Sequence, residues 1–194
     1  MTRKILILAT ALALSACATT PQQASLQPGE FMGGDEVETA ARLLAIASNE
    51  QDPGSLRMGQ AVRALYTMGV SLEDGADASE DLLAQWHAEM PESSQPPLRG
   101  RLLGPAYRSG MLAPGEFLET RQLFDGGKPA RVTFSAAANS PLEVTIKDNS
   151  ERTICKTDPG NPSSCRWTPP FSGRYAIKVE NRGVETVRYF MVIG

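Results

Sequence analysis

The chain has 194 residues, of which 41% are hydrophobic and 6% aromatic, with 22 acidic side chains against 19 basic ones. This length suits one or two small domains, and the formal net charge of −3 excludes a generic nucleic-acid binder, which would be basic. A single apolar run, at the start, leaves no later segment that could span a bilayer. One histidine and three cysteines restrict the catalytic chemistry that the chain can perform.

The first 16 residues have the layout of an export signal. Arg3 and Lys4 form a short basic region, and the apolar stretch 5–13 is too short for a transmembrane helix. It ends in Leu14-Ser15-Ala16-Cys17, which resembles the bacterial lipobox, whose cysteine receives diacylglycerol and becomes the new N-terminus. The resemblance implies a signal peptide over 1–16, lipidation of Cys17 and attachment to a membrane. An ordinary secretory signal with an incidental cysteine is the alternative.

The residues after the cysteine predict where the anchored protein resides and how it is tethered. Ala18 stands where an aspartate would resemble the retention signal for the inner membrane, so the expected location is the outer membrane. Residues 17–34 are rich in Pro, Gln, Thr and Gly without any periodicity. We therefore predict a flexible tether over 17–34, which keeps the folded part close to the membrane.

Helical periodicity dominates residues 35–92. Three starts carry acidic side chains, which is typical of helix N-termini: Asp35 with Glu38, Asp52-Pro53, and Asp77 with Glu80. We predict about three helices here, followed by a Pro- and Ser-rich linker over 93–111.

From residue 112 onward apolar and polar side chains alternate, and turn signals recur about every ten residues. Short strands with no helix between them are typical of an antiparallel β-sandwich, here with about seven strands over 112–194. The expected fold class is therefore α+β, with a small helical unit before the sandwich.

Several segments of the second half are similar to a known domain family: Gly110-Met-Leu-Ala-Pro-Gly115, Phe124-Asp-Gly-Gly127, the run from Ser172 to Asn181, and the run from Tyr189 to Val192. This half resembles the pre-peptidase C-terminal domain, a small β-sandwich attached to secreted bacterial enzymes, some relatives of which bind collagen or carbohydrate. The resemblance implies an accessory binding domain, although no recognisable protease domain precedes it here.

Cys155 and Cys165 are the two cysteines that remain after lipidation, and they flank a loop dense in turn-forming residues. In an exported chain this arrangement predicts a disulfide across a hairpin. A redox-active pair would have the CxxC spacing, and a zinc site would have further ligands nearby.

Two pairs of neighbours place aromatic rings beside cations: Arg166-Trp167 and Arg174-Tyr175. Together they suggest a candidate ligand surface, with ring faces for sugars or peptides. The alternative is that Trp167 and Tyr175 fill the core of the sandwich.

Other chemistry receives little support. His87 is the only imidazole, and we interpret it as a solvated helical residue, because the chain has no nucleophile elbow or zinc-protease motif. The acidic run 72–81 could suit calcium, but its spacing does not match an EF-hand and acidic residues are common at helix starts. No catalytic residue, metal or cofactor is predicted. A hydrolase using two of the many carboxylates remains an alternative.

Charge divides the mature chain into two halves. Residues 17–98 hold 3 basic and 13 acidic side chains, whereas residues 99–194 hold 14 basic and 9 acidic ones. A helical segment this short buries little surface alone, and we therefore predict that it docks on the sandwich through Leu65, Leu83 and Trp86. The alternative is that the basic surface awaits an anionic external partner and the two halves move independently.

The favoured function is a non-catalytic outer-membrane lipoprotein that binds an envelope protein or a polysaccharide. Besides the carboxylate hydrolase, a regulatory module for a secreted peptidase is an alternative, with the loop 156–164 as its contact.

Overall fold

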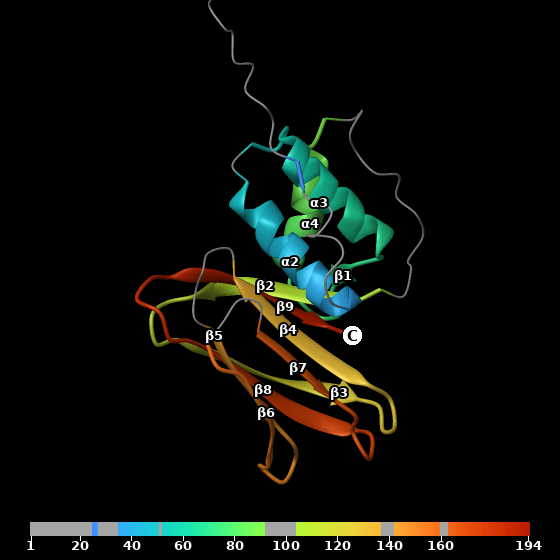
Figure 1. The fold of residues 1–194 in the computed structure, drawn as a ribbon, viewed down its shortest axis with the longest axis vertical. Helices are drawn as coiled ribbons and strands as arrows, with labels where there is room; N and C mark the ends of the chain where they lie inside the picture. The colour runs from blue at the N-terminus through green and yellow to red at the C-terminus, as the bar shows by residue number, and fades with distance from the viewer. Residues whose placement is uncertain (1–24, 27–34, 51, 92–103, 137–141, 160–162) are drawn as a thin grey trace, which may run out of the picture.

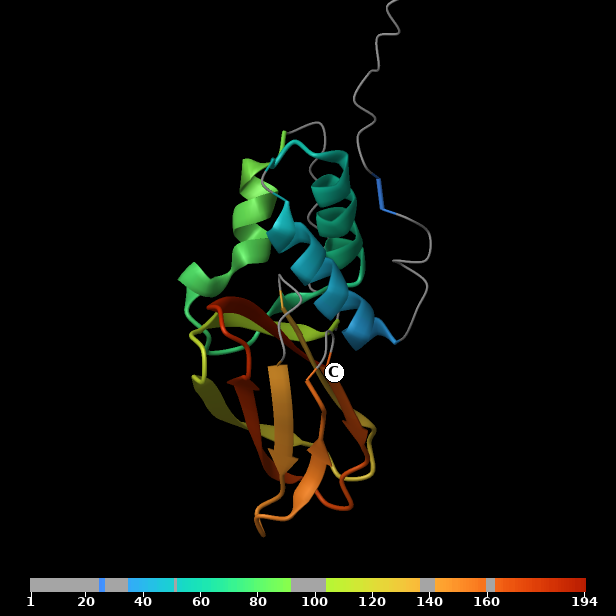
Figure 2. The same cartoon turned by 60° about the vertical axis from the view of Figure 1, so that its left-hand side comes forward.

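The computed structural model describes residues 25–26, 35–50, 52–91, 104–136, 142–159 and 163–194. They form three layers, with helices packed on one face of a five-stranded sheet and a four-stranded sheet packed on its other face (Figures 1 and 2). The predicted α+β class is confirmed. The expected signal peptide, Cys17 and most of the expected linker lie outside the described residues.

The helical layer contains the three predicted helices, of which the first begins as predicted and the other two begin a few residues later. It consists of α2 (Glu36–Asn49), α3 (Leu56–Thr67), a 3-10 turn η1 (Ala78–Glu80) and α4 (Leu82–Glu89). Asp35 caps α2 as expected, accepting a hydrogen bond from the Glu38 amide at 3.0 Å. Asp52-Pro53 does not start α3, because Asp52 instead accepts a hydrogen bond from Gly54 in a turn and Ser55 provides the cap.

The third helix start is also displaced. Asp77 caps only η1, and α4 begins after Asp81, whose Oδ1 accepts a hydrogen bond from the Ala84 amide at 3.0 Å. The sequence therefore indicated the right region, but a second acidic cap follows closely and starts the longer helix.

The five-stranded sheet has the order β1-β2-β9-β4-β7 and is antiparallel except for the β1–β2 pair. Its strands are β1 (Ser71–Leu72), β2 (Ala106–Leu112), β9 (Val187–Ile193), β4 (Ala130–Ala136) and β7 (Ser163–Trp167). β2 occupies residues that the sequence suggested as linker, so the sheet begins at Ala106 rather than at 112. The sequence did not indicate β2 because the face of this strand opposite to Tyr107 carries the polar Arg108, where a sandwich strand usually carries an apolar side chain. Tyr107 itself packs against the helices.

The four-stranded sheet has the order β3-β8-β5-β6 and is antiparallel throughout. Its strands are β3 (Phe117–Phe124), β8 (Gly173–Asn181), β5 (Leu142–Lys147) and β6 (Thr153–Lys156). The seven strands from β3 to β9 lie in the predicted sandwich region, and β1 and β2 are the two additional strands.

The helices dock on the sheet through a shared hydrophobic core. Leu65 and Leu83 are buried, and the ring of the half-buried Trp86 lies 6.2 Å from that of Phe190 in β9. Phe190 and Val192 belong to this core, whereas their neighbours in β9, Tyr189 and Met191, face the separate core between the two sheets. The predicted docking is therefore confirmed for the burial of Leu65 and Leu83 in a core shared with the sheet, whereas Trp86, which was also expected to be buried, is only partly so.

Opposite charges meet at one end of this docked interface. Asp35 lies between two cations of the sheet, with Arg166 Nη2 at 2.7 Å and Arg131 Nε at 3.4 Å from its Oδ2. Glu38 also contacts Arg166, at 3.4 Å. Because these groups are partly exposed, the pairs contribute about 0–1 kcal/mol each and mainly set the orientation of α2.

Part of the expected tether packs on the helices. Leu26 is only 6% exposed and belongs to the helical core, and its amide N–H donates to Gln60 Oε1 in α3 at 2.8 Å. The segment Ser25–Leu26 accordingly lies beside α3 (Figures 1 and 2). The flexible run predicted over 17–34 is thus interrupted by a buried residue, which a composition rich in Pro and Gln did not indicate.

Candidate interaction surface

The four residues suggested as a ligand surface do not form one surface. Arg166 faces the helices and pairs with Asp35 and Glu38, as described above. Tyr175 is buried between the sheets, and Trp167 is half-buried against the same core. Of the four, only Arg174 lies exposed on the outer face of the four-stranded sheet.

The rings of Trp167 and Tyr175 belong to an aromatic cluster with Phe124. Phe124 lies 4.7 Å from Trp167 and 5.9 Å from Tyr175, both in edge-on geometry. Such edge-to-face pairs stabilise a core beyond the area they bury. The rings therefore fill one end of the sandwich, as the core alternative in the sequence analysis expected.

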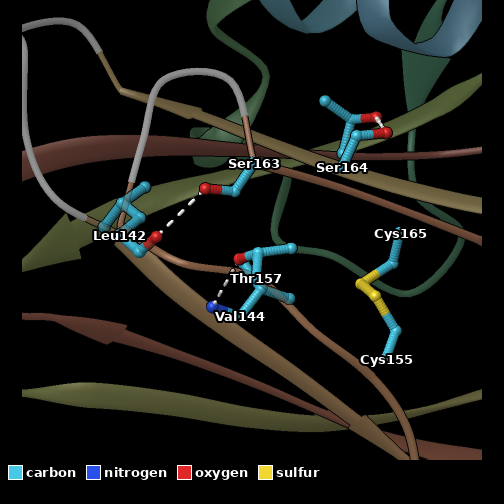
Figure 3. Close-up of a disulfide and its surroundings, with 8 residues drawn as sticks. Leu142, Val144, Cys155, Thr157, Ser163, Ser164 and Cys165 are labelled. Carbon is cyan, nitrogen blue, oxygen red and sulfur yellow. Dashed lines mark hydrogen bonds between the residues drawn. A yellow bond between two sulfur atoms is a disulfide. The ribbon is translucent and has the colours of Figure 1, made fainter.

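The disulfide joins the two sheets. Cys155 in β6 is bonded to Cys165 in β7, and the adjoining loop is fastened at both ends (Figure 3). Thr157 Oγ1 accepts a hydrogen bond from the Val144 amide at 3.2 Å, and Ser163 Oγ donates to the Leu142 carbonyl at 3.0 Å. The cysteines therefore act as a cross-link, and residues 160–162 at the centre of the loop lie outside the described residues.

A cluster of polar side chains connects the two sheets near β2 and β3. Arg108 in β2 points between Glu73 and Glu80, with its Nε 4.0 and 3.5 Å from their carboxylate oxygens. The Gln122 amide of β3, in the other sheet, also donates a hydrogen bond to Glu73. Both carboxylates are directed at the same guanidinium, so they form an ion-pair cluster that bridges the sheets.

The acidic run 72–81 serves the helix starts and a buried tyrosine. Asp81 caps α4 and also accepts a hydrogen bond from the Tyr107 hydroxyl at 2.7 Å. The same hydroxyl accepts one from the Leu83 amide at 3.0 Å, and burial raises the pKa of Tyr107 far above its ordinary value. Within the described ranges, the structure has no group of three or more His, Cys, Asp or Glu side chains placed to hold a metal ion.

His87 lies on α4, and its ring packs 4.8 Å from that of Tyr66 on α3. It is therefore half-buried between two helices rather than fully solvated as the sequence suggested. The helix α4, which carries His87, lies in the helical layer, and the five-stranded sheet separates this layer from the four-stranded sheet (Figure 1).

The outer face of the four-stranded sheet is not covered by any element that the structure describes. The helices lie against the five-stranded sheet, and no described element packs on this face (Figures 1 and 2). We call it the open face. The strand register gives it six cations and three carboxylates, a balance of +3: Arg121, Lys147, Lys156, Arg174, Lys178 and Arg182, with Glu119, Glu143 and Glu180.

Ion pairs on the open face neutralise only some of these charges. Arg182 contacts both Glu143 and Glu180, and Lys156 and Lys178 each contact one of the two. The hydrogen bond from Arg182 lowers the pKa of Glu143. Arg174 makes no ion pair with the residues that the structure describes, so its charge is available to an external anion.

Exposed apolar side chains lie at both ends of β3 on the same face. Phe117 is 54% exposed, with Lys178 Nζ 4.4 Å above its ring, and Leu123 is 64% exposed opposite Arg174 in the register. Large apolar groups, aromatic rings and arginines on one surface are typical of protein–protein contacts.

A separate cleft of about 620 Å³ lies in the helical layer. It runs between α3 and the ends of α2 and α4, with Leu56, Met68 and Met90 among its lining residues. Pro91 also lines it, and the chain continues from there into residues that the structure does not describe. We therefore assign no ligand to this cleft.

No protein-family model matches the chain, and no curated protein matches it. Among solved structures, part of the chain is similar to a periplasmic inhibitor of g-type lysozyme from Aeromonas hydrophila, at 16% identity over 46% of this chain and 84% of that one, with a TM-score of 0.37. The corresponding inhibitor from Salmonella Typhimurium gives 19% identity, 46% and 88% coverage, and a TM-score of 0.30.

The pre-peptidase C-terminal domain of a Bacillus anthracis collagenase also matches, at 13% identity over 46% of this chain and 88% of that one, with a TM-score of 0.39. The sandwich resemblance drawn from the sequence thus has a counterpart among solved structures. At these identities and scores the likenesses carry no inference about what the chain binds.

Proposed function

We propose that this chain is a lipid-anchored protein of the bacterial envelope that acts by binding an acidic partner protein on its open face. The observation that carries the proposal is that the two sheets differ in what covers their outer faces. One sheet is covered by docked helices, whereas the other presents a face with a balance of +3 in a chain of net charge −3.

The chemistry of the open face favours binding over catalysis. Its cations attract an acidic surface over the distance of a Debye length, and the exposed Phe117 and Leu123 provide apolar contact once the partner arrives. A protein partner suits this combination better than a purely charged polymer, since such a polymer has no apolar groups that Phe117 and Leu123 could contact.

The described residues that are nearest in sequence to the proposed anchor lie on the side opposite to the open face. Ser25 and Leu26, the described residues nearest to Cys17 in sequence, pack on α3, across the molecule from the four-stranded sheet (Figure 1). Eight residues, 18–25, separate Cys17 from Leu26 in the sequence, and a flexible chain of that length has a typical reach of 5–6 Å × √8, or about 14–17 Å. The helical layer would therefore face the membrane and the open face would point away from it.

Membrane attachment is expected to depend on lipidation of Cys17, since the lipobox resemblance implies that its thiol carries the lipid. No helix in the described part of the chain has the length and apolar character that crossing a bilayer requires. Cys17→Ala should leave a precursor that no longer incorporates labelled palmitate and is uncleaved or cleaved elsewhere. Metabolic labelling and membrane fractionation measure both. A variant that is processed and membrane-associated like the parent would show that the lipoprotein proposal is wrong.

The binding proposal is tested by reversing charges on the open face. The double variant Lys147→Glu/Arg174→Glu changes the face by four charge units, and should weaken partner binding by about tenfold. The measurement is quantitative mass spectrometry of proteins recovered with the mature lipoprotein from detergent-solubilised envelopes.

The matched control is Arg57→Glu/Arg63→Glu, which makes the same charge change on α3 in the helical layer. It should retain the partner at the parental level. Equal recovery of every protein by the parent and both variants, or loss of the partner only in the α3 control, would contradict the assignment to the open face.

A further inference from the structure

The strand β3 has one edge that pairs with β8 and another that pairs with no strand in the described part of the chain. We propose that this free edge binds the same edge of a second copy, so that the two four-stranded sheets join into one continuous sheet. This inference does not depend on what the open face binds. An unpaired edge of eight residues is a template for strand addition unless the chain blocks it.

The hydrogen bonds between β3 and β8 determine which backbone groups point to the free edge. The Asn181 amide donates to the Glu116 carbonyl at 2.9 Å, so residue 116 is directed at β8. Because the direction alternates along an antiparallel pair, every second residue is directed the other way. The residues whose N–H and C=O groups point to the free edge are therefore Phe117, Glu119, Arg121 and Leu123.

The same alternation can be checked further across the sheet. When the alternation is followed through the register of β8 and β5, it predicts that the backbone N–H and C=O groups of Val144 point toward β6. There the Val144 carbonyl accepts a hydrogen bond from the Thr157 amide at 2.9 Å, and its N–H donates to Thr157 Oγ1 at 3.2 Å. The assignment of the free edge is therefore consistent with the hydrogen bonds two strands away.

The side chains along this edge are complementary to themselves. When two copies of β3 pair antiparallel about a two-fold axis at Thr120, Glu119 lies opposite the second copy's Arg121, and Phe117 lies opposite its Leu123. The axis repeats both pairs, which gives two ion pairs and two apolar pairs on one face. Opposite charges and apolar pairs directly across two strands stabilise their pairing. Neither Glu119 nor Arg121 has an ion-pair partner among the described residues.

The neighbouring registers are less favourable. Only every second residue of β3 directs its N–H and C=O groups to the free edge. The register can therefore shift only in steps of two residues, because a shift of one would place these groups opposite residues whose N–H and C=O groups point back to β8. A shift of two places Glu119 opposite Glu119 in one direction, and Arg121 opposite Arg121 in the other. Like charges opposite each other destabilise pairing, so the charge order selects the register centred on Thr120.

The two-fold axis of such a pair is perpendicular to the sheet, because antiparallel neighbours keep the same face upward. In one copy the helical layer lies on one side of the four-stranded sheet (Figure 2), and Leu26 belongs to the core of that layer. In the pair, both helical layers would therefore lie on the same side of the joined sheet. Two lipid anchors on Cys17 could then enter one membrane.

A cysteine at the axis tests the proposal in the full-length protein in intact cells. Thr120→Cys should give a disulfide-linked dimer of this chain on a non-reducing gel, since the axis places residue 120 opposite its own copy at a separation that a disulfide spans. Thr145→Cys, on β5 in the middle of the same sheet, is the matched control and should give at least tenfold less dimer.

Charge variants in the Thr120→Cys background test the register itself. Glu119→Arg or Arg121→Glu alone should reduce the dimer about tenfold by opposing like charges, and the combined exchange Glu119→Arg/Arg121→Glu should restore it. Coexpression of the two single variants should also restore a mixed dimer. The proposal is overturned if Thr120→Cys gives no more dimer than Thr145→Cys, if it links to a different protein instead, or if the charge exchange does not restore what the single changes remove.

Discussion

Phe190→Ala should destabilise the protein by about 3–5 kcal/mol, because it removes a fully buried ring from the core that joins the helices to the sheet. The ring packs near Trp86 of α4, and the same core includes Leu65 of α3. The sheet offers few other large side chains on this face, so the helices cannot close the resulting cavity without moving. Urea denaturation of the mature chain, followed by circular dichroism, measures the change.

The matched control is Phe171→Ala, which removes the same ring from a position that is 81% exposed. It should change stability by less than about 0.5 kcal/mol. Because the helices and the sheet share one core, the parent should unfold in a single transition, and the isolated fragment 35–98 should be poorly helical. A helical fragment that folds alone, with two separate transitions in the parent, would contradict the shared core.

Removing the disulfide should have the second largest effect. In the chain-entropy description, Cys155→Ser/Cys165→Ser frees a loop of 11 residues in the unfolded state and costs about 2.8 kcal/mol. The bond also joins β6 and β7, which belong to different sheets, so its loss loosens the contact between their edges. Peptide mapping of the exported parent without reduction should recover one peptide pair that joins the two cysteines.

Treatment of the folded parent with a thiol reductant should reproduce the loss of stability in the double variant. Free thiols at both positions in exported protein, or a double variant as stable as the parent, would refute a stabilising disulfide.

Many of the helices and strands could be predicted from the sequence pattern of a few neighbouring residues. Asp35 with Glu38 predicted a cap that forms, and the alternation from Leu142 to Ile146 predicted a strand whose apolar side chains are buried. Such elements carry their signal within a few residues. The docking of Leu65 and Leu83 was also predictable, because a short helical segment has little other apolar surface to bury against.

The elements that the sequence did not reveal depend on contacts between distant residues. β1 is only two residues long and exists because it pairs with β2, and β2 carries Arg108 on the face where a sandwich strand normally carries an apolar side chain. Leu26 is a single apolar residue in a polar run. It is buried because its side chain packs in the helical core and its amide N–H donates a hydrogen bond to Gln60.

The candidate surface was predictable only in part. Arg174 was singled out and lies on the open face, but its sequence neighbour Tyr175 necessarily points to the other side of the strand. The same alternation separates Arg166 from Trp167. Adjacent residues in a strand cannot share a face, so a surface built from neighbouring pairs was geometrically excluded once both segments became strands. The partners of Arg174 on the open face come from other strands, which local pattern does not bring together.

Site-specific photocrosslinking in living cells tests the central claim most directly. A photoreactive residue at Thr145, in the middle of the open face, should capture an acidic envelope protein, and the Lys147→Glu/Arg174→Glu changes should abolish that product. The same residue at Thr67, exposed at the end of α3, should not capture it. Capture of the partner from Thr67 but not from Thr145 would contradict the assignment of binding to the open face.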